Sequence, residues 1–235
     1  MQDIQAAFLA AFNLIVSLDA DLFAIVGLSL TVTLSAVGIS CLLGFPLGAL
    51  LAISRFPGRG MIVVFISSLM GLPPVVVGLT VYLFLSSAGP LGSWQLLYTP
   101  TAMIIAQSVL VTPIIAALTR QIIEDLNGEY SELLRSMSAR RRDVLSTLLW
   151  DARYSLITAA LAGMGRALAE VGAVMIVGGN INHVTRVMTT AIALETSKGE
   201  LALALGLGII LVLLSISINA ALMSLRTSME RFAYA

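Results

Sequence analysis

The sequence predicts an all-α membrane protein with about five transmembrane helices, and three observations support this prediction. Its 235 residues have a mean hydropathy of +0.99 and are 58% hydrophobic. Only 11% of them are charged, whereas soluble domains carry roughly 25% charged residues. The charges also leave long uncharged stretches, which is typical of membrane-spanning helices. A chain this short cannot bury so much apolar surface in one soluble core, so a soluble enzyme and a disordered chain are both disfavoured.

The first element is a short apolar stretch, Ile4–Leu18, that ends at two aspartates. Its 15 residues are fewer than the about 20 that a helix needs to cross a bilayer. We therefore expect residues 1–21 to form an interfacial segment. A sixth span at this place is the alternative.

Gaps between charges locate the spans. Residues 22–54 hold no charge and predict one span, and the uncharged residues 60–119 are long enough for two. Turn residues at 86–94 separate these two. The remaining spans are less uniform, because one contains Arg166 and Glu170. In order, the five predicted spans are 22–54, 61–85, 100–119, 154–177 and 201–225.

Basic residues predict the orientation. With the N-terminus outside, ten arginines fall in inner segments, and only Arg186 and Lys198 fall in outer ones. Inner loops of membrane proteins carry such an excess of basic residues. The expected topology has a large cytoplasmic loop at about 120–153 and an outer segment at about 178–200. Five spans do not divide into two equal halves, so a transport path would form more naturally between two copies of the chain.

Charges and prolines inside the spans are candidate functional features. Arg166 and Glu170 are four residues apart, so they would share a helix face and pair. They are either a structural ion pair or part of a transport path. Pro73 and Pro74 would break the second span, either to line a path or as a packing kink. Gly44 and Gly48 are spaced for close helix packing.

The cytoplasmic loop is amphipathic and mixes charges with Leu and Val at helical spacing. It predicts two short helices with a break near Ser138, and Asn127-Gly128 before them is a helix-start or turn signal. Arg140 to Arg142 could lie on anionic lipid headgroups. Alternatively, a helix of the loop is presented to the groove of a soluble partner.

This loop resembles the EAA loop of permease subunits in ABC importers. Glu132 matches the Glu of that motif, with Leu133 and Leu134 in the two Ala places. Ser138 stands in the Gly place and is followed by Ala139, and Trp150-Asp151 stands where the family has Leu-Pro. A serine there would be strained by roughly 1–2 kcal/mol if it adopted the left-handed conformation that glycine allows.

The resemblance covers nearly the whole chain and extends to molybdate, tungstate and sulfate permeases. Val171, Gly178-Gly179-Asn180 and residues 194–199 are most similar to the tungstate branch. The other matching segments are 55–58, 72–78, 89–92, 166–173 and 185–192.

The resemblance implies one transmembrane permease domain over residues 1–235, with the MetI-like fold. It implies a homodimer, two cytoplasmic ABC ATPase subunits, an extracytoplasmic oxyanion-binding protein and surrounding membrane lipid in a prokaryotic inner membrane. The carried-over ATPase-coupling residues are Glu132, Leu133, Leu134, Met137, Ser138 and Ala139. The carried-over path or gate residues are Pro73, Pro74, Arg166, Glu170 and Asn180.

The sequence therefore predicts the membrane subunit of an ATP-driven oxyanion importer, with tungstate as the expected substrate. Molybdate or sulfate/thiosulfate are the alternative substrates. The chain has no Gly-x-x-x-x-Gly-Lys-Ser/Thr loop, so a separate subunit would hydrolyse ATP, and we predict no enzyme activity, cofactor or metal site here. The zero net charge gives no reason to expect nucleic acid. A proton-coupled secondary transporter that uses Glu170, or a scaffold without transport, are the rival functions.

Overall fold

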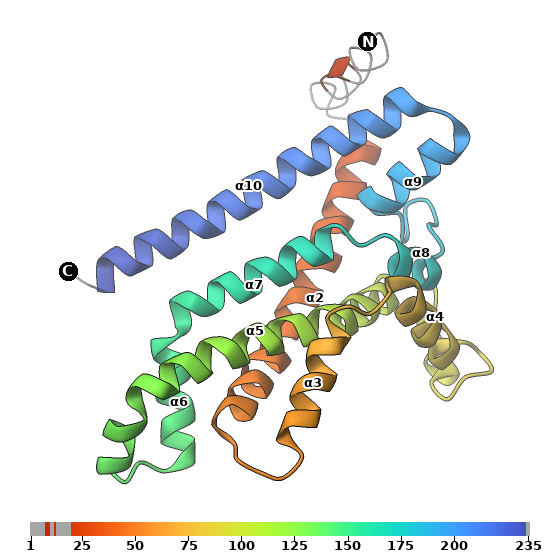
Figure 1. Cartoon of the computed structure of the whole chain (residues 1–235). Coiled ribbons are helices and arrows are strands. Elements are labelled where there is room, and N and C mark those ends of the chain that lie inside the picture. The colour runs from red at the N-terminus through yellow and green to blue at the C-terminus, as the bar shows by residue number, and fades with distance from the viewer. Residues whose placement is uncertain (1–7, 10–11, 13–19, 234–235) are drawn as a thin grey trace. The chain divides into compact units, whose positions relative to one another are not determined.

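The computed structural model describes residues 8, 9, 12 and 20–233, and the described part is helical throughout (Figure 1). This confirms the predicted fold class. The predicted interfacial segment, residues 1–21, lies almost wholly outside the described residues. The elements are α2 (Ala20–Ile53), α3 (Arg59–Leu69), α4 (Pro74–Leu85), η1 (Gly92–Trp94), α5 (Pro100–Ser136), α6 (Arg141–Asp151), α7 (Arg153–Leu168), α8 (Gly172–Gly178), α9 (Met188–Lys198) and α10 (Leu201–Ala233).

Five stretches of the described chain are long and apolar enough to cross a membrane, if each broken pair of helices counts as one span. Helices α2, α5 and α10 qualify alone. The pairs α3–α4 and α7–α8 qualify only together, since each pair bends at a short break. The five predicted spans therefore have helical counterparts, and two of these are interrupted.

The first break was predicted from Pro73 and Pro74. Pro73 is extended, with φ −64° and ψ 124°, and precedes the first residue of α4. A residue before proline disfavours the helical conformation, and proline itself fits the first turn of a helix. The two prolines therefore separate α3 from α4.

The second break corrects the prediction of a continuous span over 154–177. Helix α7 ends at Leu168 and α8 begins at Gly172. The backbone leaves the helical conformation at Val171, where φ is −120°. Glu170 thus lies between two helices, not on the same helix face as Arg166.

The loop at 120–153 also differs from the prediction. Helix α5 continues without interruption through Asn127-Gly128 to Ser136, so the expected helix start there is wrong. Packing explains the difference. Ile122, Leu126 and Tyr130 contact an apolar core, and burial of these side chains stabilises the helical conformation on both sides of Gly128. The predicted break near Ser138 is confirmed, since the chain turns between α5 and α6.

The chain groups into two compact units, described here separately. The first contains the described residues up to Ala36 with 73–107 and 165–220, and the second contains 37–72, 108–164 and residues from 221 onward. Within the first unit a core forms from Leu22, Met188, Ala191, Leu207 and Ile210. Within the second, Ala49, Ile123, Leu148, Ala152 and Leu156 form the core.

Close packing in the second unit depends on the two glycines of α2 that the sequence singled out. A Cβ atom on Gly48 would lie 2.4 Å from the carbonyl oxygen of Ala116, and one on Gly44 would lie 2.8 Å from Ile115 Cγ2. Only glycine lets α2 and α5 approach so closely. The predicted packing role of both residues is confirmed.

Candidate gate and coupling sites

The two helix breaks lie against each other in the first unit. A Cβ atom on Gly78 of α4 would lie 2.7 Å from Ala173 Cα of α8. At the start of both helices, a Cβ atom on Gly172 would lie 3.1 Å from Val75 Cγ2 and 3.7 Å from Pro74 Cβ. The prolines of the first break and Glu170 of the second are thus brought into one region, although nearly a hundred residues separate them in the sequence.

Glu170 bridges the second helix break with two side-chain contacts. Its side chain is only 2% exposed, and Oε2 accepts a 2.7 Å hydrogen bond from Arg166 Nη1. Its other oxygen, Oε1, accepts from the backbone N–H of Ala173 at 2.9 Å. That N–H belongs to the first turn of α8 and has no partner within the helix. One carboxylate therefore neutralises a cation and accepts from a buried N–H group at the start of the following helix.

The predicted pairing of Arg166 with Glu170 is present, although a helix end separates the two residues. Arg166 has a side chain that is 29% exposed, so water reaches part of its guanidinium. Glu170 does not share that exposure. The pair combines a partly hydrated cation with a buried anion, which is compatible with both the structural and the path-lining interpretations.

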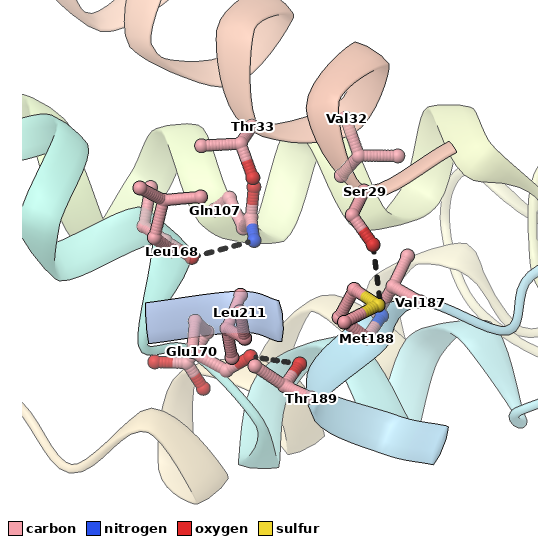
Figure 2. A pocket seen from close by; sticks show the side chains of 11 residues that line it. Ser29, Val32, Thr33, Gln107, Leu168, Glu170, Val187, Met188, Thr189 and Leu211 are labelled. Atoms are coloured by element: carbon pink, nitrogen blue, oxygen red, sulfur yellow. Dashed lines mark hydrogen bonds between the residues drawn. The ribbon is translucent and has the colours of Figure 1, made fainter. Parts of the chain in front are cut away.

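Helices α5 and α9 contact this break, and α2 in turn contacts α9 (Figure 2). From α5, Gln107 Nε2 donates to the carbonyl oxygen of Ala167 at 3.2 Å. From α9, Thr189 Oγ1 donates to the carbonyl oxygen of Glu170 at 2.8 Å. The start of α9 is itself tied to α2, because the Met188 N–H donates to Ser29 Oγ at 2.8 Å.

A cavity of about 20 Å³ lies among these side chains. Such a volume is enough for one water molecule. Gln107, whose buried Oε1 has no hydrogen-bond partner among the described residues, is one of the lining residues. A tetrahedral oxyanion is several times larger than water. In this conformation the region is closed to an anion.

Asn180 lies in the predicted outer segment and contacts α9, not Glu170. It has a positive φ of 50°, and its Nδ2 donates to the carbonyl oxygen of Thr190 at 3.4 Å. Nearby, the N–H of Tyr98 donates to the Val177 carbonyl oxygen at 2.9 Å. A side-chain hydrogen bond with Tyr82 raises the pKa of Tyr98. Asn180 therefore contacts the first turn of α9, the same turn in which Thr189 contacts the helix break.

The predicted coupling residues lie at the end of α5 and in the following turn. Leu133 and Met137 are 60% and 70% exposed, and Glu132 is exposed beside them. Leu134 instead packs against the apolar core of the second unit. Ala139 is half-buried. Only Leu133 and Met137 thus offer apolar surface to a partner.

Ser138 adopts the left-handed conformation that the motif's glycine would provide, with φ of 51°. The Ala139 N–H donates to the Leu134 carbonyl oxygen at 3.1 Å, and the Ser138 N–H donates to that of Arg135 at 3.0 Å. These two bonds form a Schellman motif, the usual glycine-dependent end of a helix. The tight turn is kept with serine, at a conformational cost of roughly 1–2 kcal/mol.

The other departure from the motif, Trp150-Asp151, lies at the end of α6. A single residue, Ala152, separates α6 from α7. Arg153 lies 4.7 Å from the Trp150 ring centre and 4.4 Å from that of Tyr154. Its Nη1 also donates to the Trp150 carbonyl oxygen at 2.6 Å. These contacts restrict the backbone where α6 ends and α7 begins, near the position at which the EAA motif has a proline.

Sequence reasoning missed a charged cluster in the second unit. Glu124 of α5 pairs with both Arg120 and Arg59, one to each carboxylate oxygen. Arg59 Nε also donates to the carbonyl oxygen of Leu51 at 2.7 Å. The i,i+4 spacing of Arg120 and Glu124 could have predicted their ion pair. No sequence pattern predicted the contact with Arg59, which lies 65 residues before Glu124 in the chain.

Comparisons with known proteins show what this chain is similar to. Residues 44–231 match the family of binding-protein-dependent transport system inner membrane components. A tungstate uptake system permease protein of Peptoclostridium acidaminophilum is 40% identical over 226 residues, which cover 96% of this chain and 99% of that protein. A permease of the same description from Campylobacter jejuni is 40% identical over 63% of this chain and 62% of its own length. A sulfate transport system permease protein of Synechocystis sp. is 28% identical over 66% of this chain and 58% of its own length.

Proposed function

Because the chain belongs to the family of binding-protein-dependent transport system inner membrane components, we propose that it forms the membrane path of a tungstate importer. The observation that carries the substrate class is the 40% identity, over almost the full length of both chains, to a tungstate uptake permease. Similarity to a sulfate permease is lower and covers less of the chain. Sulfate and molybdate are therefore the second candidates.

Membership of this family makes the chain a transport component of the inner membrane, not an enzyme. The family has ATPase and substrate-binding partners, so the energy comes from a separate subunit. Family membership also favours the ATP-driven importer over a proton-coupled transporter based on Glu170 and over a scaffold without transport. Uptake of tungstate by vesicles containing the whole transporter, in competition with molybdate and sulfate, tests the substrate.

A homodimer is part of this proposal. In the described chain, α3 contains no buried residue, and Met61, Val64 and Phe65 are exposed on it. Apolar residues are also exposed on α4. Lipid or a second copy must cover these side chains. Disulfide crosslinking between cysteines introduced along α3, in a Cys41→Ser background, would detect a symmetric contact.

We propose that the paired helix breaks form a gate on the path, with Pro73, Pro74, Arg166 and Glu170 at its centre and Asn180 supporting α9. The support is that Glu170 caps α8, that α5 and α9 donate hydrogen bonds to the break, and that the cavity beside the break has room for only one water. Irregular backbone at membrane depth is tolerated where it lines a cavity or is buried in protein. A change in these few hydrogen bonds would move α8 against α4.

We further propose that the end of α5 and the turn at Ser138 transmit the ATPase's movement. Glu132 would fix this segment in the ATPase groove, with Leu133 and Met137 as apolar anchors. Leu134 would connect the segment to the core of the second unit, and Ser138 and Ala139 would set the angle of the turn. The support is the exposure of the two apolar anchors beside the glutamate.

Replacing Glu132 by alanine tests this coupling role. Glu132→Ala is expected to weaken association of the ATPase by about tenfold, or to uncouple hydrolysis from uptake. Insertion into the membrane should not change, because Glu132 is solvent-exposed. Glu129→Ala is the matched control, since Glu129 is also exposed on α5 but lies outside the motif. Full ATPase content, stimulation by the binding protein and uptake in the Glu132 variant would reject the assignment.

A further inference from the structure

A pocket of about 380 Å³ lies in the second unit, apart from the helix breaks. It forms where the end of α5, the Ser138 turn, the start of α6 and the turn after α2 come together. Three arginines from three of these segments line it: Arg55, Arg135 and Arg141. The pocket therefore brings together arginine side chains from separate parts of the sequence.

The charge of these arginines is not compensated in the described part of the chain. None of the three side chains makes an ion pair or a hydrogen bond there, whereas Arg59 and Arg120 both pair with Glu124. No aspartate or glutamate is among the described residues that line the pocket. Three guanidinium groups around one hollow produce a positive potential that attracts an anion.

The polar groups between the arginines add hydrogen-bond donors. Asn127, Ser131 and Ser138 line the same pocket, and each can donate to an anionic oxygen. Arginine presents planar pairs of N–H groups that match the oxygens of phosphate and similar anions. We propose that this pocket is a binding site for a tetrahedral oxyanion group, supplied either by free oxyanion in solution or by the phosphate of an anionic lipid headgroup.

The position of the pocket on α5 favours a small anionic group over a protein segment. Asn127, Ser131 and Arg135 recur every four residues and form one face of the helix. Leu133 and Met137 are each two positions further along, about 200° around the helix. The pocket and the two apolar anchors proposed to contact the ATPase therefore lie on nearly opposite faces of α5, with Glu132 between them, so an anion in the pocket leaves both anchors free.

An anion in this pocket would join α5, α6 and the turn after α2. It would hold the Ser138 turn at its present angle, and so it would oppose rearrangement of the segment proposed to transmit ATPase movement. The site itself does not depend on that coupling role, because it rests on the pocket and its unpaired arginines. Binding is measurable on this chain without any ATPase present.

The test uses the full-length chain in nanodiscs, at constant ionic strength, with thermal unfolding as the readout. In one arm the lipid is phosphatidylcholine alone, and inorganic phosphate or tungstate is titrated. In the other arm phosphatidylglycerol replaces part of the lipid, without free oxyanion. The variant Arg135→Gln/Arg141→Gln is compared with Arg140→Gln/Arg142→Gln, which removes two neighbouring exposed arginines outside the pocket.

We expect saturable stabilisation of the unmodified chain and of the Arg140/Arg142 variant in at least one arm. The Arg135/Arg141 variant should bind about a hundredfold more weakly, at about tenfold for each lost charge-assisted contact. Arg135→Lys/Arg141→Lys should fall between, because it keeps the charge and loses the paired N–H geometry. The four changed side chains are exposed, and unfolding without anion checks that each variant is folded.

The arm that responds identifies the source of the anion. Stabilisation by free phosphate or tungstate, lost in the Arg135/Arg141 variant, supports binding of free oxyanion. Stabilisation only by phosphatidylglycerol, lost in the same variant, supports a lipid phosphate. Equal responses of the two glutamine variants would indicate general surface charge and overturn the proposal, as would the absence of a response in both arms.

Discussion

Two carboxylates of this protein, one in each compact unit, pair with arginine in different surroundings. Glu170 lies at a helix break, is 2% exposed, and contacts one arginine and one backbone N–H. Glu124 lies within the continuous helix α5, is 31% exposed, and contacts two arginines. The second cluster has more ionic contacts, yet water reaches all of its members.

The comparison shows that burial and backbone contacts determine the importance of an ion pair more than the number of charges does. Exposed ion pairs contribute little to folding stability, because water solvates the separated charges almost as well as the partner charge does. Removing one member of a buried pair leaves a charge or an N–H group without a partner. Glu170 should therefore be indispensable to its unit, whereas Glu124 should be only a modest stabiliser.

The largest effect is expected for Glu170→Ala. It removes the acceptor of the Ala173 N–H and the partner of Arg166, and should destabilise the fold by about 3 kcal/mol. The loss is smaller than for a fully buried pair, because Arg166 is partly hydrated. Thermal unfolding of the purified chain measures the loss.

The double variant Arg166→Met/Glu170→Ala separates the two contributions. It should be less destabilised than Glu170→Ala, because no unpaired cation remains. Equal stability of the single and double variants would reject the ion pair as a structural element. Unchanged stability together with lost tungstate uptake would assign Glu170 to the transport path alone.

A smaller effect is expected for Thr189→Val. Thr189 donates the hydrogen bond that α9 makes to the Glu170 carbonyl oxygen, and losing it should cost about 1 kcal/mol. Thr196→Val is the control, because that exposed hydroxyl bonds only within its own helix. If both variants unfold at the same temperature, α9 does not hold the break.

The smallest effect is expected for Glu124→Gln, at about 0.5 kcal/mol. This loss should shrink further in high salt, since salt screens exposed charges. Glu129→Gln, an exposed change on the same helix, provides the baseline. A salt-independent loss as large as that of Glu170→Ala would contradict the distinction between the two carboxylates.

Local chemistry accounts for the parts of the fold that the sequence predicted. Uncharged stretches located the spans, because a charge in the bilayer is expensive wherever it lies. Pro73 and Pro74 located the first break, since proline restricts its own backbone and that of the preceding residue. The turn at Ser138 was predicted through the motif, and the structure adds that serine there takes the left-handed conformation.

Tertiary contacts account for the parts that the sequence did not predict. The turn signal at Asn127-Gly128 was overridden, because neighbouring side chains gain more by packing as a helix than the local preference costs. The break at 169–171 contains no proline, and it is sustained by hydrogen bonds from Gln107 and Thr189 on distant helices. Such partners leave no local pattern.

By itself, the sequence determined that this is a helical membrane permease and where its candidate spans lie, and it predicts which loop carries the coupling motif. These follow from hydropathy, proline and motif spacing, which act over a few residues. Only the tertiary structure decided that the two helix breaks meet, that Glu170 caps α8 and that Arg55 joins Arg135 and Arg141 around one pocket. These depend on contacts between residues far apart in the chain. Burial at such contacts determines how much each charged group's interactions contribute to stability.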